Sequence, residues 1–420
     1  MMTDQAVRSF ADKGINECPF DFYKWMHENS PVYFDPGINA FIVSDYALIQ
    51  KVALDTATFS NEKAQLNQWN LRPGGMPQEA MDLLNSGIPQ VPLLVTSDPP
   101  AHRRYRSLVQ MAFSGPRVSR MRPVIERIAD DLIDTFIKDG SVELVSQYSV
   151  KLPTFFISDQ LGVPRGDFLQ VKAWADAVVG LRGLMGTDEQ IIESSRQLLN
   201  FQTYFSDLIE RRRAAGPAEN DMLDDLLNAR IEGERPLNHE ELISTVQQLI
   251  VAGSESTTSG ITSAVWMLLS NPELIEGVTT DENTRRRFVE EVLRLETPVQ
   301  GNLRRAMADA EIGGVAIPEG SLVQIRGAAG NRDPKVFECP ERLRMEDAKL
   351  TPHLAFGWGA HVCIGNMLAR EEMAVSLCHL LGRLPNLRFS PGKNDFTHIP
   401  SAYLRVLKAL HLGFDPVPGT

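Results

Sequence analysis

The chain has 420 residues, of which 43% are hydrophobic and 23% charged, a composition typical of a globular protein with a large core. Its net charge of -12 disfavours nucleic acid as a partner, because a protein that neutralises phosphates needs a basic surface. The four cysteines form no CxxC pair and are too sparse for a disulfide scaffold, so we expect all four to be reduced. Neither a signal peptide nor a run long enough to cross a bilayer is visible, so we expect a cytoplasmic protein without a membrane anchor.

The N-terminal part predicts a small β-rich region. A short helix is expected over 20–28, followed by strand-like runs at 32–34 and 40–43. Residues 61–98 are rich in proline and glycine and predict a mostly irregular segment, of a kind that often lines a binding site.

Residues 98–106 place two basic side chains on one face of a predicted helix. The helix begins near Pro100, and His102 and Arg106 are four residues apart. Such a pair can bind an anion, but taken alone it is better interpreted as a solvated basic helix end. From 117 to 235 one helix follows another, with breaks at 139–140, 162–164, 183–186 and 216–217, so the chain is predicted to be mainly α.

A long helix is predicted from His239 to Ser270, with Asn238 as its N-cap and Glu241 completing a capping box. Its middle is rich in glycine, serine and threonine, which weaken a helix. Two interpretations stay open. The small residues allow either a close helix crossing or a gap for a flat ligand beside the acid Glu255 and the alcohol Ser256.

Further along, Glu291 and Arg294 are spaced as a helical ion pair, and residues 312–320 and 322–325 read as strands. Cys363 then follows a loop with Gly357 and Gly359 and precedes a buried helix that begins at Asn366 and ends before Pro385. The helix N-terminus is expected to lower the pKa of the Cys363 thiol and favour a thiolate, a soft metal ligand.

The spacing F-G-x-G-x-H-x-C-x-G-x-x-L-A-R at 356–370 resembles the haem-binding signature of the cytochrome P-450 superfamily, in its soluble bacterial form. The segments at 98–106, 252–256, 291–294 and around Arg304 resemble other motifs of that family in the same order. The resemblance implies a mainly α fold with a minor β lobe and with haem between the long central helix and the helix after the cysteine loop. It also implies one domain over 1–420, with a β-rich part from about 30–60, 299–330 and 385–410.

The resemblance implies haem b as cofactor, with Cys363 as the iron ligand. Glu255 and Ser256 would supply protons, with Thr257 as a fallback because serine stands where the family more often has threonine. A structural role in fixing the cysteine loop falls to Glu291, Arg294 and Arg342. The remaining cofactor contacts implied, propionate ligands first, are His102, Arg106, Arg304, Ala252, Gly253, Phe356, Gly357, His361 and Gly365.

The implied activity is insertion of one oxygen atom from O2 into a small hydrophobic substrate, by hydroxylation or oxidative dealkylation. Electrons would come from NAD(P)H through a ferredoxin reductase and a ferredoxin to a monomeric enzyme. The ferredoxin is expected at a basic patch near the cysteine, with candidates Arg103, Arg104, Arg344 and Lys349. A terpenoid, alkyl aromatic or steroid-like substrate is expected in a pocket that residues 181–185 help to cover and that is lined by Leu94, Val95, Gln248, Val251, Val299, Gln300 and Ile399.

Three alternatives stay open. A peroxide-driven oxygenase of the same fold would replace the acid and alcohol by Arg-Pro, and Glu255-Ser256 argues against it. A haem sensor or carrier would have no need of that pair. A helical interaction protein would bind no haem.

Overall fold

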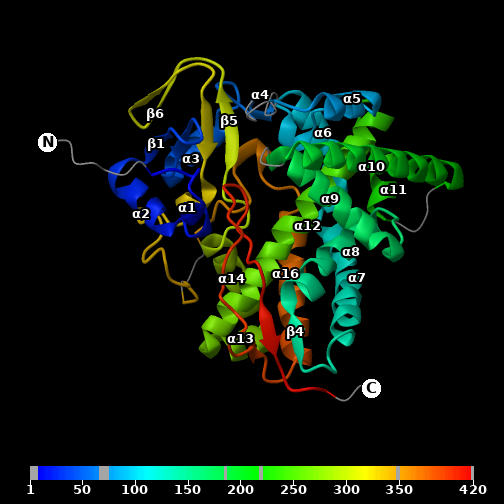
Figure 1. The fold of residues 1–420 in the computed structure, drawn as a ribbon, viewed down its shortest axis with the longest axis vertical. Coiled ribbons are helices and arrows are strands. Elements are labelled where there is room, and N and C mark those ends of the chain that lie inside the picture. Colours follow the sequence, from blue (N-terminus) through cyan, green and yellow to red (C-terminus); the bar gives the residue numbers. More distant parts are fainter. Residues whose placement is uncertain (1–7, 66–74, 184–186, 217–220, 347–350, 418–420) are drawn as a thin grey trace.

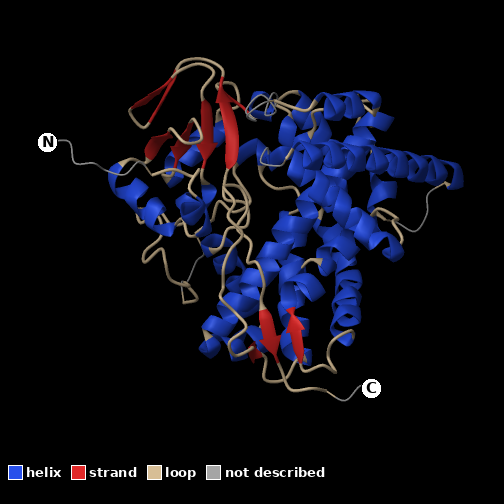
Figure 2. Cartoon of the chain, viewed as in Figure 1, coloured by secondary structure: helices blue, strands red, loops and turns tan. Residues whose placement is uncertain are grey.

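The computed structural model describes residues 8–65, 75–183, 187–216, 221–346 and 351–417 (Figure 1). Most of these residues are helical, and Figure 2 shows the strands gathered mainly on one side of the molecule. The helices of the N-terminal part are α1 (Lys13–Glu17), α2 (Phe20–Asn29), α3 (Tyr46–Leu54), α4 (Glu62–Gln65) and α5 (Gln78–Ser86). The later helices are α6 (Ala101–Gln110), α7 (Gly115–Asp134), α8 (Lys151–Gln160), α9 (Phe168–Gly183), α10 (Asp188–Ala215), α11 (Met222–Asn228), α12 (His239–Ser270), α13 (Ile275–Thr280), α14 (Glu282–Leu295), α15 (Gly327–Gly330) and α16 (Asn366–Arg383).

Five strands form the main sheet, in the order β1-β2-β8-β5-β3. Strand β2 pairs in parallel with β8, so that residues 40–43 lie beside residues 322–325. The remaining strands form a separate hairpin and a small sheet of order β4-β10-β9. The strands are β1 (Val32–Asp35), β2 (Ala40–Val43), β3 (Phe59–Ser60), β4 (Ser141–Glu143), β5 (Asn302–Ala306), β6 (Ala310–Ile312), β7 (Val315–Ile317), β8 (Leu322–Ile325), β9 (Arg388–Phe389) and β10 (His411–Gly413).

Helix α12 runs through the middle of the molecule and packs against α8, α9, α14 and α16 (Figure 1). It has the predicted bounds, and the predicted capping box of Asn238 and Glu241 is present. Most of its residues are buried, in a large apolar cluster that also includes side chains of α7, α8, α9, α10 and α16. Within the central part of the helix, the positions that are not fully buried lie between residues 248 and 256, where a site can form.

Several short elements differ from the sequence expectation, among them α5 and β4. Residues 78–86 form α5 in a segment predicted to be irregular, because packing against α10 supplies stability that nine residues lack by themselves. Strand β4 was not predicted, since its three residues are held by pairing with β10, far along the chain. In the described part of the chain, no helix is both long and apolar enough to cross a membrane.

Candidate active site

The cysteine loop is closed by backbone hydrogen bonds. Gly357 and Gly359 have φ of 74° and 73°, and a Cβ on Gly359 would lie 3.0 Å from the carbonyl oxygen of Ala53. The N–H of Cys363 donates to the carbonyl oxygen of Phe356 at 2.8 Å, and the side chain of Asn366 donates to the carbonyl of Cys363 at 2.6 Å. The loop thus presents Cys363 at the N-terminal end of α16, with its side chain accessible.

The pKa of the Cys363 thiol is raised, contrary to the sequence expectation. The protein atoms crowded around the sulfur raise it by desolvation, although the residue keeps an exposed face, and this outweighs the N–H of Gly365 and the charges of Arg106 and Arg370, which lower it. The pKa-lowering effect of the helix N-terminus is therefore smaller than the pKa-raising effect of desolvation. A cation bound to the sulfur would deprotonate it directly.

Four basic side chains converge beside this loop from three elements. His102 and Arg106 lie on α6, Arg304 on β5, and His361 on the short 3-10 helix η7 (Gly359–His361). The imidazole rings of His102 and His361 have centroids 4.2 Å apart, and Arg106 donates to the carbonyl of Val362. As predicted, the helix that begins after Pro100 presents both of its basic residues, His102 and Arg106, to the cysteine loop.

Asp98 is the carboxylate that acts on both Arg304 and His361, and it offsets only part of the effect of the basic groups and of burial. Arg304 is 3% exposed, and burial lowers its pKa to about 10 although Asp98 raises it. Burial and then the neighbouring basic groups His102 and Arg304 lower the pKa of His361 to about 3. Its Nε2 is buried without a hydrogen-bond partner in the described part of the chain. These groups are suited to an anionic ligand with carboxylates.

Asn61 is a member of this cluster that the sequence did not indicate. Its amide oxygen accepts from Arg304 at 2.5 Å, while its amide nitrogen lies 3.4 Å from Nδ1 of His361. Asp98 accepts from the backbone N–H of Asn61 at 2.9 Å. No local pattern could have indicated this, because Asn61 meets its partners only through the tertiary fold.

One face of α12 is open. The residues that are not fully buried in its central part follow a helical stripe of Gln248, Val251, Ala252, Glu255 and Ser256, with Gly253 at its side. Ala252 is exposed, and a Cβ on Gly253 would meet no atom within 4 Å. Thr257 is buried, so Ser256 is the alcohol on the open face; its Oγ donates to the carbonyl of Ala252 at 2.8 Å.

Glu255 has a partner that sequence reasoning missed. Its carboxylate lies 3.1 Å from the ammonium of Lys172 on α9, which also contacts Asp176. Burial lowers the pKa of Lys172, but the two carboxylates outweigh it and raise the pKa. The acid is therefore held toward α9 rather than toward Ser256.

The comparisons with known proteins agree with this arrangement. A family model described as Cytochrome P450 matches residues 181–394. The chain is 33% identical over 385 residues to Cytochrome P450 107B1 of Saccharopolyspora erythraea, covering 89% of each protein. The chain belongs to the cytochrome P450 family. It is also 36% identical to 6-deoxyerythronolide B hydroxylase of the same organism over 324 residues, 76% of this chain and 77% of that protein. A solved cytochrome P450 from Bacillus megaterium in complex with testosterone superposes with a TM-score of 0.79 and 28% identity, covering 94% of this chain and 99% of that chain.

This cytochrome P450 is a monooxygenase, and its cofactor is haem b held by a cysteine thiolate. The residues present fit that group. His102, Arg106, Arg304 and His361 would supply donors for carboxylates of that group, and among the described residues nothing satisfies the buried Nε2 of His361. The small residues Ala252 and Gly253 leave α12 open to a flat ring.

Two predicted roles are corrected by the geometry. Gln300 is 2% exposed, and its amide already accepts from Tyr23 at 2.6 Å and donates to Thr297 at 2.5 Å, so it does not offer hydrogen bonds to a ligand. Arg342 takes part in the Glu291 and Arg294 cluster only through its backbone carbonyl, which accepts from Arg294 at 2.7 Å, while its side chain is exposed. A motif identifies a residue but not the atom that it uses.

The other predicted pocket residues differ in exposure. Leu94 is 8% exposed, Val95 41% and Ile399 51%, and Val299 is half-buried. Of the predicted roof, Leu181 is buried, and residues 184–186 lie outside the described residues.

Proposed function

We propose that this cytochrome P450 hydroxylates or dealkylates a small hydrophobic substrate that carries one polar group, with electrons from a ferredoxin. The observation that supports the polar group is Gln248, whose buried Oε1 has no hydrogen-bond partner among the described residues. Gln248 lies on the open stripe of α12, one turn from Ala252, or about 6 Å along the helix axis. A hydroxyl or amine of a steroid-like, terpenoid or alkyl aromatic compound would satisfy it, consistent with the testosterone bound by a structural neighbour.

When bound, haem b with a thiolate ligand supplies the activation of O2. The chain supplies position and protons. Ser256 Oγ can exchange its bond to the carbonyl of Ala252 for one to a water on the open face, and so hold a proton donor there. Glu255 can pass protons inward when its contact with Lys172 is exchanged for one with water.

The ferredoxin is proposed to dock on the face of α6 and the cysteine loop, where Arg103 is exposed. Arg104 does not qualify, contrary to expectation, because its guanidinium lies 3.0 Å from Glu241 and 3.3 Å from Glu234. Arg344 packs over the ring of Phe337, and Lys349 lies outside the described residues.

Replacement of Ser256 by alanine tests the oxygenase proposal. Steroids, terpenoids and alkyl phenols are first screened for a low-to-high spin shift of the haem, and turnover is then measured with NADPH, ferredoxin reductase and ferredoxin. Ser256→Ala should still bind substrate and consume NADPH, but a smaller share of electrons should reach product and more should appear as hydrogen peroxide, because the positioned proton donor is lost.

Ser254→Ala is the matched control. Ser254 makes the same side-chain bond to the carbonyl four residues earlier, at 2.7 Å, but on the buried side of α12, so its coupling should equal that of the parent. Equal coupling in Ser256→Ala and parent would contradict the role of Ser256. Substrate binding without any oxygenated product in the parent would favour a haem sensor or carrier, and full activity with hydrogen peroxide alone would favour a peroxide-driven enzyme.

A further inference from the structure

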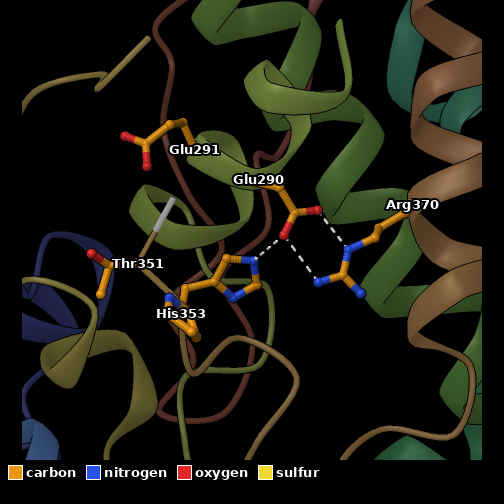
Figure 3. A pocket seen from close by; sticks show the side chains of 6 residues that line it. Glu290, Glu291, Thr351, His353 and Arg370 are labelled. Atoms are coloured by element: carbon orange, nitrogen blue, oxygen red, sulfur yellow. Dashed lines mark hydrogen bonds and ion pairs between the residues drawn. The ribbon is translucent and has the colours of Figure 1, made fainter. Parts of the chain in front are cut away.

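A second cluster of charged side chains lies between α14 and the two ends of the cysteine loop (Figure 3). It borders a small cavity of about 250 Å³. The cavity is lined by Glu290, Glu291, Thr351, Pro352, His353 and Arg370. Arg370 also acts on Cys363 through its charge, but Glu290 and His353 take no part in the sites described above.

Glu290 joins residues from both sides of the loop. Its Oε1 lies 2.5 Å from Nε of Arg370, and its Oε2 accepts from Nη2 of Arg370 at 3.0 Å. The same Oε2 lies 3.2 Å from Nε2 of His353 (Figure 3). His353 precedes the cysteine loop and Arg370 follows it on α16, so one carboxylate on α14 contacts both ends.

The backbone fixes the tautomer of His353. The N–H of Ala355 donates to Nδ1 of His353 at 3.2 Å, so that nitrogen carries a lone pair and Nε2 carries the proton. This proton faces the Glu290 carboxylate, whose Oε2 lies 3.2 Å from Nε2, so the contact favours the ionised carboxylate. Burial raises the pKa of Glu290, but His353 and Arg370 outweigh burial and bring the pKa to about 2. The carboxylate therefore stays charged at neutral pH.

The cluster reaches the cysteine through Phe356. The guanidinium of Arg370 lies 4.4 Å from the centroid of the Phe356 ring, and the ring of His353 lies 5.8 Å from it. The carbonyl of Phe356 accepts the N–H of Cys363 at 2.8 Å. A displacement of Arg370 or His353 would therefore be passed to the backbone that carries the sulfur.

We propose that Glu290 is a positioning residue that holds both ends of the cysteine loop and thereby keeps the Cys363 sulfur in place as the haem ligand. The proposal rests on haem ligation by Cys363 and not on the proposed substrate, so the two can fail separately. Its role is distinct from that of the neighbouring Glu291, which binds Arg294 and the N–H of Arg344.

Glu290→Gln in the haem-loaded enzyme tests this role, with Glu371→Gln as the matched control. Glu371 also links α14 to α16, through Arg286 at 3.3 Å, and contacts Arg122 at 2.7 Å, but within the described part of the chain its carboxylate forms no ion pair with His353 and does not contact Phe356. The readout is the carbon monoxide complex of the reduced protein. The protein is warmed mildly, and the rate at which the thiolate-type Soret band is replaced by the band of a protein without thiolate ligation is measured. Circular dichroism measures unfolding in the same samples.

Glu290→Gln should lose the thiolate-type band about fivefold faster than Glu371→Gln or more, at an unfolding midpoint similar to that of the control. Arg370→Met removes the same ion pair by changing its other partner. It is measured in place of Glu290→Gln if that variant does not fold. The double variant should decay no faster than the quicker single variant, because both remove one link. Equal decay in Glu290→Gln and Glu371→Gln, or additive effects in the double variant, would overturn the proposal in favour of an ordinary ion pair between helices.

Discussion

Glu255 and Ser256 are neighbours in sequence but their side chains have different partners. The carboxylate of Glu255 is paired with Lys172 on α9, while the hydroxyl of Ser256 is bonded to its own helix on the open face. A proton that passes through both groups needs movement or water between them. The pairing would also link the proposed proton supply through Glu255 to α9, the helix that precedes α10.

Another single residue predicts a measurable effect of pH. Glu372 on α16 is 3% exposed, and burial raises the pKa of its carboxyl from 4.5 to about 8. The folded protein therefore keeps Glu372 protonated where the unfolded chain ionises it. Its contribution favours the folded state fully below pH 4.5 and is lost progressively as the pH rises through about 8.

Glu372→Gln should therefore gain stability relative to the parent as the pH rises. The difference in the free energy of unfolding between variant and parent should increase between pH 4.5 and about pH 8, on the order of a few kcal/mol in total. Unfolding by denaturant at a series of pH values measures it, with Glu371→Gln as the control. Parallel curves for parent and Glu372→Gln would show that the carboxyl is not buried as described.

At the scale of elements, Arg294 connects α14 to the segment from 331 to 342. It is 1% exposed, contacts Glu291 through two nitrogens at 2.9 Å and 2.7 Å, and donates to the carbonyls of Asn331, Pro340 and Arg342. Arg294→Met should destabilise the protein by about 3 kcal/mol or more, because it leaves Glu291 as an unpaired buried charge and three carbonyls without a donor.

Arg286→Met on the same helix is the comparison. Arg286 pairs with Glu282 and Glu371 but is 46% exposed, so its loss should cost about 1 kcal/mol or less. Thermal and denaturant unfolding of the two variants would measure the difference. Similar losses would contradict the assignment of Arg294 as the buried connection.

Sequence predicted the elements whose signals are local. The bounds of α12 follow from the N-cap Asn238, from Glu241 in its first turn and from the stop at Pro272, all of which lie in or beside the helix that they limit. It did not predict β4, whose three residues are defined by β10, nor the contact of Glu255 with a lysine on another helix. The sequence also led us to place Gln300 in the pocket. Its hydrogen bond with Tyr23 joins residues far apart in the chain and cannot be predicted from a local pattern.

At the scale of the molecule, the motifs meet as the family resemblance implied. α6, β5 and η7 bring His102, Arg304 and His361 beside the cysteine loop, and α12 presents its open face. The order of the motifs predicted that these residues meet, but not the contacts of their side chains. In the structure Asn61 connects Arg304 to the cysteine loop, and Arg104 forms an ion pair with Glu241. The extent of one domain over 1–420 stays a prediction.

The most direct test of the account is the carbon monoxide difference spectrum of the reduced parent protein and of Cys363→Ser. The parent should show the Soret band typical of thiolate ligation, and Cys363→Ser should lose it, because a serine oxygen cannot replace the sulfur as a soft ligand. Cys378→Ser, on α16 and away from the loop, should keep the band. A thiolate-type band that persists in Cys363→Ser would contradict the assignment of Cys363 and, with it, the site described above.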